Sequence, residues 1–283
     1  MHVVFLHKIA IMVVFPKAKI NLGLRITRKR EDGYHDIETI FYPVSLCDAL
    51  EFVISSGVDQ DDELSVSGIS TGEPSANNLV MKAVKNLRKH FSFPPLKIHL
   101  HKAIPIGAGL GGGSSDAAGI ITGITRYFDL PADNQTLKAI ALEIGSDCPY
   151  FIENLPSIAT GRGELMEPLE AFLSGYYILL LNPGIHISTR DAYHNCYPEY
   201  PSTELTKLVM QPVEEWKNTI INDFEKSVFI KYPQIANIKK ALYESGAVYS
   251  SMSGSGSTVY GIYTSPPVVP ETIKEFVIYN GCL

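Results

Sequence analysis

Five glycines between Gly107 and Gly113 form the stretch of this chain best suited to binding a ligand. Glycine loses the most backbone freedom on ordering, so such a run is unfavourable inside a helix or strand. It suits a loop whose backbone approaches a ligand closely. The following residues predict a helix over 114–128, with an apolar face of alanine and isoleucine. A glycine-rich loop that opens into a helix N-terminus is a site for anions, usually phosphate. The alternative is a mobile linker.

Two familiar phosphate-binding loops fit this stretch poorly. The P-loop has Lys and then Ser or Thr after its last glycine, whereas Ser114 stands where that Lys would be. The dinucleotide pattern G-x-G-x-x-G does match at Gly107, Gly109 and Gly112, and it keeps a nucleotide-dependent oxidoreductase as an alternative. That fold requires a second strand ending in an acid. Asp129 has the right spacing, but it lies between two predicted helices.

A lysine and an aspartate offer the other chemistry that phosphoryl transfer uses. Transfer needs positive charge around the phosphoryl group, and a hydroxyl nucleophile benefits from a carboxylate that accepts its proton. Lys19 shares a strand face with Asn21, although an isolated strand lysine is usually solvated. Asp147 follows a predicted helix and precedes Pro149 in an apolar setting, so it is either a helix-end cap or a functional acid.

The elements that must position these residues predict an α+β protein. Strands come first and helices follow, a pattern unlike alternating β-α-β. A domain boundary is expected near residue 163, which gives domains 1–163 and 164–283. The predicted strands cover 17–26, 37–44, 48–54, 64–67, 96–101, 157–160, 176–182 and 258–263, and the predicted helices cover 79–91, 114–128, 133–143, 188–194, 202–210, 233–245 and 270–276.

Composition excludes some classes of protein. The formal charge of −6 over 283 residues argues against a general nucleic-acid binder. Basic residues concentrated near the N-terminus could form a solvated hairpin or receive phosphates. The four cysteines lack metal or disulfide spacing and fit free thiols in a reducing cytoplasm. Residues 1–11 are too short and too polar for a membrane span, and Met12 is a candidate true start.

The stretch Pro105–Ala118 resembles the glycine-rich signature of the GHMP kinases, the superfamily of galactokinase, homoserine kinase and mevalonate kinase. The resemblance implies a two-domain α+β fold with a mixed or antiparallel sheet and helices in each domain. It places the active site in the cleft between the domains. The ATP-binding residues that it implies are Pro105, Ile106, Gly107, Ala108, Gly109, Leu110, Gly111, Gly112, Gly113, Ser114 and Ser115.

Three further motifs occur in the order that this superfamily shows. Ala18-Lys19-Ile20-Asn21 is similar to its lysine strand, although Lys17 separates Pro16 from Ala18 where some members join them directly. The segment Gly145–Phe151 resembles the motif that carries the catalytic base, which corresponds to Asp147. Met252–Ser257 resembles a second glycine loop that closes over the phosphates, and by itself it would be equally consistent with a plain turn. Lys19 and Asp147 are therefore the expected catalytic residues.

The sequence Asp32-Gly33-Tyr34-His35 is by default a hairpin turn with an aromatic pair. It also resembles a motif of one GHMP kinase, in which the Tyr and His contact the cytidine of the substrate. That resemblance makes Asn21, Tyr34 and His35 the expected substrate-binding residues. It implies ATP with Mg²⁺ and a cytidine-diphosphate-linked polyol as substrate. No metal ligand is assigned from the sequence, although Ser115 is a possible contact, and a monomer or homodimer is expected. A homoserine or mevalonate type of kinase and a non-catalytic binding protein are the alternatives.

Overall fold

The chain forms two compact units in the computed structural model, which describes residues 11–55, 61–70, 72, 74, 77–188, 192–193, 196 and 198–283. The first unit contains the chain up to Pro16, Cys47–Ala103 and Gly113–Ile152, and the second contains Lys17–Leu46, Ile104–Gly112 and Glu153–Leu283. Most of the helix predicted near 188–194 and the first ten residues lie outside the described residues. The boundary expected near residue 163 stays a prediction.

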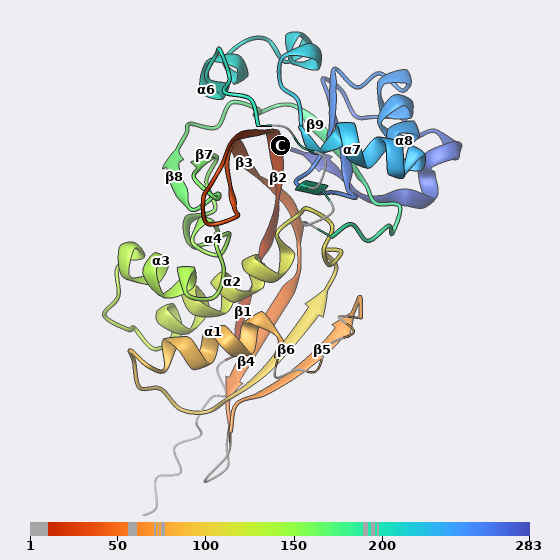
Figure 1. Cartoon of the computed structure of the whole chain (residues 1–283). Helices are drawn as coiled ribbons and strands as arrows, with labels where there is room; N and C mark the ends of the chain where they lie inside the picture. Colours follow the sequence, from red (N-terminus) through yellow and green to blue (C-terminus); the bar gives the residue numbers. More distant parts are fainter. Residues whose placement is uncertain are drawn as a thin grey trace, which may run out of the picture. The chain divides into compact units, whose positions relative to one another are not determined.

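A mixed four-stranded sheet with helices along one side forms the first unit (Figure 1). The strand order is β1-β4-β6-β5, in which β5 pairs with β6 in parallel and the other pairs are antiparallel. Its core is formed by apolar side chains of the sheet and of the helices. The elements are β1 (Met12–Val14), β4 (Ala49–Ile54), β5 (Glu63–Gly68), β6 (Leu96–Lys102), α1 (Leu79–Leu87), α2 (Gly112–Tyr127), α3 (Asn134–Leu142) and α4 (Tyr150–Glu153).

Two four-stranded sheets form the second unit, with their own apolar cores. One has the order β2-β3-β7-β8 and the other, antiparallel, the order β10-β11-β9-β12. The strands are β2 (Lys17–Lys29), β3 (His35–Cys47), β7 (Ser157–Thr160), β8 (Leu165–Pro168), β9 (Tyr177–Leu181), β10 (Tyr249–Met252), β11 (Val259–Tyr263) and β12 (Val277–Cys282). The helices are α6 (Leu205–Val209), η2 (Val213–Asn218), α7 (Phe224–Lys231), α8 (Pro233–Glu244) and η3 (Glu271–Phe276).

Sheets and helices therefore occur in both units, which confirms the α+β class and the mixed or antiparallel sheets. Several sequence predictions need correction. The strand β1, the strand β8 and the helix α7 were not expected. The sequence predicts a glycine–serine loop over Ser250–Ser257, but its first three residues belong to the strand β10. The helix after the glycine run begins at Gly112, two residues early, so Asp116 lies beyond its first turn.

The strand β2 departs from the expected pattern of one buried and one exposed face. Residues 18–24 are all buried, including the polar Lys19 and Asn21. Alternation correctly predicted which residues share a face. It could not predict that both faces are covered, because the residues that cover the polar face come from distant segments of the second unit.

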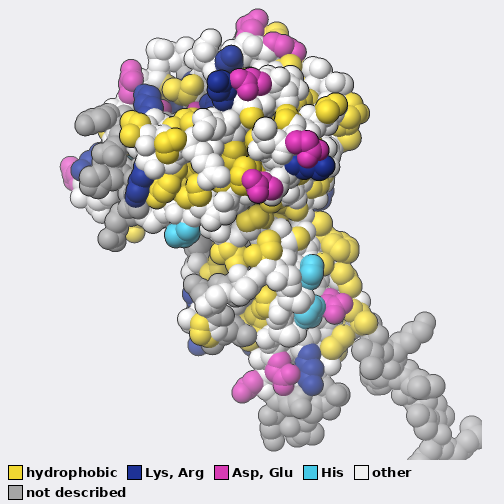
Figure 2. All heavy atoms as spheres, turned by 90° about the vertical axis from the view of Figure 1, so that its right-hand side faces the viewer, with side chains coloured by type: hydrophobic (Ala, Val, Ile, Leu, Met, Phe, Trp, Pro, Cys, Tyr) yellow, Lys and Arg dark blue, Asp and Glu magenta, His cyan; other side chains and the backbone are white. Residues whose placement is uncertain are grey.

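Charged side chains of both signs are intermixed on the face in Figure 2, which fits a modest formal charge of −6. Within the residues that the structure describes, no helix is long and apolar enough to cross a bilayer.

A buried charge cluster supports the start of α2 inside the first unit. Lys102 Nζ donates to Asp48 and, at 2.7 Å, to Asp116, and all three residues are at most 3% exposed. Two carboxylates facing one ammonium would leave a buried net negative charge. Burial raises the pKa of Asp116 to about 8, against the attraction of Lys102, and the neighbouring Asp48 adds to the rise. Asp116 is therefore protonated near neutral pH.

This cluster predicts a particular pH dependence of stability. The pKa of Asp116 is about 8 in the folded chain and near 3.8 in the unfolded chain, so folding takes up a proton between these values. Stability must then fall as pH rises through this window. We expect Asp116→Asn to remove that slope. Between pH 6 and pH 8, the Tm of the wild type should fall by about 3 °C or more relative to the variant. Parallel Tm–pH curves from calorimetry would contradict the assignment.

Candidate active site

The buried ammonium group of Lys19 lies at the centre of the polar face of β2. Its Nζ donates to Asn21 Oδ1 at 2.5 Å and to the carbonyl of Gly109 at 3.1 Å. It also lies 4.9 Å from the centroid of the Phe41 ring, close enough for a cation–π contact. The period of a strand places Lys19 and Asn21 on one face, and the buried charge is stabilised by the polar groups around it.

The first glycine loop, residues 107–111 ahead of α2, turns its carbonyl groups into the protein. The carbonyl of Ala108 accepts from Thr258 N–H, that of Gly109 from Lys19 Nζ and Ser253 Oγ, and that of Leu110 from Lys19 N–H. In a trans peptide the N–H group points opposite to the carbonyl. The N–H groups of Gly109, Leu110 and Gly111 are therefore directed away from these donors.

The backbone conformation of this loop has the form of an anion-binding nest. The φ angles are +62° at Gly107, +79° at Gly109 and +70° at Gly111, alternating with residues of negative φ. Successive N–H groups in such an alternation converge on one side of the chain. The loop continues into α2, so it also leads to a helix N-terminus. This arrangement is suited to a phosphate group.

A second loop, residues 253–258, packs directly against the first. Ser253 Oγ donates to the carbonyl of Gly109 at 2.8 Å and accepts from Asn21 N–H at 3.1 Å. A Cβ atom on Gly109 would lie 1.9 Å from the carbonyl oxygen of Ser253, so only glycine fits there. The hydroxyl of Ser253, in the second loop, thus binds both the first loop and the strand β2.

Asn21 is bound through every polar group of its backbone and side chain. Its Nδ2 donates to Thr39 Oγ1 at 2.9 Å, and its carbonyl accepts from Tyr260 Oη at 2.8 Å. Thr39 and Tyr260 were not identified from the sequence. Only the pairing of β2 with β3 and the position of β11 bring them to Asn21, so no local pattern could have indicated them.

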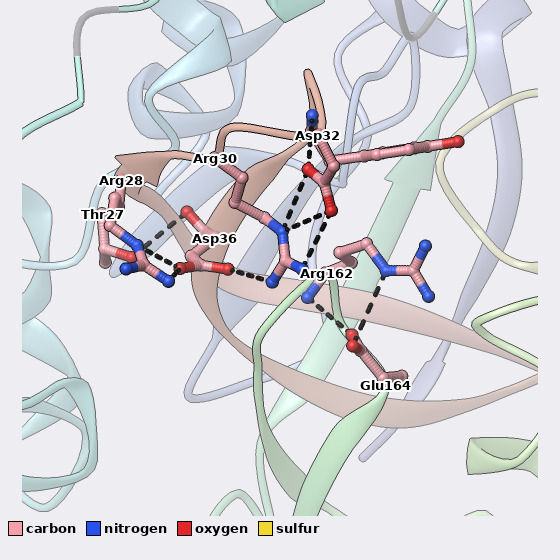
Figure 3. A network of polar contacts seen from close by, with 8 residues as sticks. Thr27, Arg28, Arg30, Asp32, Asp36, Arg162 and Glu164 are labelled. Atoms are coloured by element: carbon pink, nitrogen blue, oxygen red, sulfur yellow. Dashed lines mark hydrogen bonds and ion pairs between the residues drawn. The ribbon is translucent and has the colours of Figure 1, made fainter.

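The hairpin between β2 and β3 is held by its own charges (Figure 3). Arg30 lies between Asp32, at 2.9 Å, and Asp36, at 3.0 Å, and Arg28 pairs with Asp36 at 2.7 Å. Hydrogen bonds from Arg30 lower the pKa of Asp32 and of Asp36. The solvated hairpin is therefore the better description of these two arginines, because carboxylates already neutralise them.

The aromatic pair of the hairpin occupies two different environments. The ring of His35 stacks on that of Tyr193, with centroids 4.7 Å apart, and Tyr193 packs edge-on against Phe224. Tyr34 is 58% exposed, with the guanidinium of Arg162 5.3 Å from its ring centroid. Burial lowers the pKa of His35, and the charge of Lys29 lowers it further, so its imidazole is neutral at pH 7. Tyr193 was not identified from the sequence.

The expected site residues divide between the two units. Lys19, Asn21, Tyr34, His35 and 105–112 belong to the second unit, where the contacts above join Lys19 and Asn21 to the loop. Gly113, Ser114, Ser115 and Asp147 belong to the first unit. Their participation in one site with Lys19 stays a prediction.

Asp147 lies in the turn between α3 and α4 and is partly exposed. The contact of its carboxylate is with the hydroxyl of the adjacent Ser146, at 3.5 Å, the outer limit of a hydrogen bond. Asp133 in the same unit shows what a helix cap looks like here, since its Oδ1 accepts from Thr136 N–H at 2.8 Å. The carboxylate of Asp147 thus contacts a side-chain hydroxyl at 3.5 Å, whereas the carboxylate of this cap accepts from a backbone N–H group at 2.8 Å.

This phosphate-suited loop, supported by a buried lysine in an α+β fold, is typical of small-molecule kinases. Two family models match the chain: "GHMP kinases N terminal domain" over residues 78–153 and "GHMP kinases C terminal" over residues 207–278.

Individual relatives narrow the assignment. A 4-diphosphocytidyl-2-C-methyl-D-erythritol kinase of Bacteroides thetaiotaomicron is 48% identical over 92% of this chain and 95% of its own, and that of Porphyromonas gingivalis is 49% identical over 90% and 93%. A crystal structure of 4-(cytidine 5'-diphospho)-2C-methyl-D-erythritol kinase superposes with a TM-score of 0.75 at 28% identity, covering 90% of this chain and 91% of its own. The chain belongs to the GHMP kinases, and within them to the family of 4-diphosphocytidyl-2-C-methyl-D-erythritol kinases.

The contact between Gly109 and Ser253 predicts the effect of one added methyl group. Gly109→Ala forces the two loops apart, so ATP affinity should fall about tenfold or more. The matched control is Gly246→Ala, because Gly246 also has a positive φ, +97° against +79° at Gly109, but has open space around its Cβ. Both changes incur backbone strain of about 1 kcal/mol. Titration calorimetry with ATP should detect a loss in Gly109→Ala alone. Equal affinities in the two variants would exclude this loop from ATP binding.

Proposed function

We propose that this protein transfers the γ-phosphoryl group of ATP to the 2-hydroxyl of 4-diphosphocytidyl-2-C-methyl-D-erythritol. The products are the 2-phosphate and ADP, in the non-mevalonate route to isoprenoid precursors. The observation that carries the proposal is the conformation of the first glycine loop, in which Lys19 and Ser253 both donate to the carbonyl of Gly109. The names of the relatives support the choice of substrate.

Binding of the ATP phosphates falls to the backbone of the first loop. The N–H groups of Gly109, Leu110 and Gly111 converge on one side, and α2 adds the positive end of its dipole. Lys19 fixes the loop on its carbonyl side, by donating to the carbonyl of Gly109. In this proposal its ammonium also stabilises charge on the transferring phosphoryl oxygens.

Mg²⁺ bound to ATP would neutralise phosphate charge during transfer. Among the residues that the structure describes, no three His, Cys, Asp or Glu side chains gather as metal ligands. A Mg²⁺ ion that enters with ATP would be held largely by phosphates and water, with one or two carboxylates. In this proposal the partly exposed carboxylate of Asp147 would contact it, whereas the Ser115 side chain is buried.

The hairpin provides the features that recognition of a cytosine ring requires. The exposed face of Tyr34 can stack on a base, and the neutral imidazole of His35 can hydrogen-bond to its edge. Stacking on Tyr193 holds the His35 ring in place and leaves its nitrogen atoms at the ring edge available for that role.

The alternatives are less well supported. A homoserine or mevalonate type of GHMP kinase has no evident use for the aromatic hairpin. The oxidoreductase reading requires a strand before Asp129, but residues 128–133, all of which are described, contain no strand and connect α2 to α3. A non-catalytic binding protein would have no need of both Lys19 and Asp147.

An ATP-consumption assay with a substrate panel tests the proposed function. The panel contains the cytidylyl substrate, homoserine, galactose and mevalonate, and phosphorus NMR identifies the product. We expect turnover with the cytidylyl compound and a new phosphomonoester signal. Faster turnover with another member of the panel would refute the proposed substrate.

His35→Ala should weaken binding of the cytidylyl substrate and leave ATP binding unchanged. Loss of one contact to a base costs about 1–3 kcal/mol, or roughly 5- to 150-fold in affinity. The control is His90→Ala, which removes an exposed histidine that also lies against an aromatic neighbour. Separate titrations of the two ligands measure both effects. Equal weakening of both ligands by His35→Ala would make the hairpin purely structural.

Asp147 and Lys19 should act as a pair in the chemical step. Asp147→Asn removes the base and keeps the shape, so kcat should fall about 10²-fold or more with little change in substrate binding. Lys19→Met should lower kcat similarly and should also weaken ATP binding, because it removes a donor to the Gly109 carbonyl. The kcat of the double variant should be little lower than that of either single variant, because residues that act as a unit are not additive.

The control for this pair is Asp133→Ala, which removes a genuine helix cap in the same unit as Asp147. It should lower Tm without lowering kcat. If Asp147→Asn behaves like Asp133→Ala, Asp147 is only a structural residue and transfer depends on positioning and Mg²⁺.

A further inference from the structure

Two buried polar residues outside the proposed catalytic and binding residues, Asn222 and Glu225, surround the start of the second loop. Asn222 is 2% exposed and Glu225 is 8% exposed. They lie at the beginning of α7, a helix that the sequence did not predict. Buried polar groups are costly unless each is satisfied, so their partners indicate what they do.

The segment that carries Asn222 is fixed to the strand β2. Leu24 N–H donates to the carbonyl of Ile221 at 2.9 Å, and Asp223 N–H donates to the carbonyl of Leu24 at 2.8 Å. The carboxylate of Asp223 accepts from Ile26 N–H at 2.8 Å. Leu24 and Asn222 thereby form a parallel bridge, and this segment follows the same strand that carries Lys19.

The side-chain amide of Asn222 spans the backbone around Ser253. Its Nδ2 donates to the carbonyls of Met252 and Gly254, both at 2.8 Å, and its Oδ1 accepts from Phe224 N–H at 3.0 Å. Both N–H groups of the amide are used. The two carbonyls lie on either side of Ser253, so one side chain fixes the backbone before and after it.

Glu225 binds the backbone N–H group of Met252, whose carbonyl is bound by Asn222. Its Oε1 accepts from Met252 N–H at 2.8 Å and from Ser251 Oγ at 3.1 Å, and its Oε2 pairs with Lys239 Nζ at 2.6 Å. The ion pair with the lysine on α8 offsets part of the cost of burying the carboxylate. Asn222 and Glu225 together bind both the carbonyl and the N–H group of Met252.

These contacts continue directly to the phosphate-suited loop. Ser253, held on both sides by Asn222, donates its hydroxyl to the carbonyl of Gly109. The orientation of that carbonyl determines the direction of the N–H group of Leu110, because the peptide unit is planar. We propose that Asn222 and Glu225 are positioning residues for ATP, acting through Ser253 on the first glycine loop; this inference rests on the proposed kinase function.

The test is Asn222→Asp, which keeps the shape but replaces the NH₂ group that donates to both carbonyls with one carboxylate oxygen facing them. We expect KM and Kd for ATP to rise about tenfold or more and Kd for the cytidylyl substrate to stay within about twofold. The matched control is Asn86→Asp. Asn86 is 5% exposed, and its amide donates to the carbonyl of Ile140 at 2.9 Å in the first unit. This control should lower Tm similarly and leave ATP affinity unchanged.

Glu225→Gln provides a second variant should Asn222→Asp fail to fold. It should weaken ATP binding about threefold or more. Combined with Ser253→Ala, its effect on Kd for ATP should be smaller than the product of the single effects, because both act on one contact. Independent effects of Glu225→Gln and Ser253→Ala, or a change in ATP affinity no greater than that of Asn86→Asp, would overturn the proposal.

Failure of this proposal and failure of the proposed function would give different results. The ATP titration requires no acceptor substrate, so it decides the role of Asn222 and Glu225 by itself. A wild-type protein that binds ATP but does not phosphorylate the cytidylyl compound would refute the proposed substrate alone.

Discussion

The carbonyl oxygen of Gly109 is the atom on which the arrangement of the site depends. It accepts from the ammonium of Lys19 at 3.1 Å and from the hydroxyl of Ser253 at 2.8 Å. These two donors come from the strand β2 and from the second loop, which are far apart in the sequence. A carbonyl has two lone pairs, so one oxygen can satisfy both donors. If this carbonyl turned away, a buried ammonium group would lose one of its acceptors, which is costly. The charge of Lys19 therefore stabilises the loop conformation.

Local patterns in the sequence predicted much of this arrangement. Alternation along 17–26 placed Lys19 and Asn21 on one face, and the glycine run correctly indicated a loop that opens into a helix. The sequence did not predict that both faces of β2 are buried. The hydroxyl of Ser253 that reaches Asn21 is 232 residues away, and no pattern within β2 contains information about it. Roles that depend on residues from both units, such as the pairing of Lys19 with Asp147, remain predictions.

The missed elements have a common physical cause. Tyr249–Met252 contains two serines, which favour loops, yet it forms a fully buried strand. A polar segment can occupy such a position when most of its polar groups find partners. Glu225 satisfies Ser251 and Met252, whereas the hydroxyl of Ser250 is buried without a hydrogen-bond partner. The helix α7 carries Glu225, and its sequence Phe-Glu-Lys-Ser-Val-Phe-Ile-Lys shows no clear helical stripe of apolar residues. Each element is therefore explained by contacts with the other, and neither could be recognised alone.

The electrostatics of the second unit explain why such positioning matters. Arg28 and Arg30 are already paired with carboxylates of their own hairpin, and Lys239 is paired with Glu225. In the proposed ATP site, anion binding at the first loop would then depend strongly on backbone N–H groups, in addition to Lys19. The attraction of a backbone dipole for an anion depends on its orientation, whereas that of a full charge depends mainly on distance. A site built this way needs its peptide groups held at fixed angles. The buried hydrogen bonds from Asn222 and Glu225 through Ser253 to Gly109 provide that constraint.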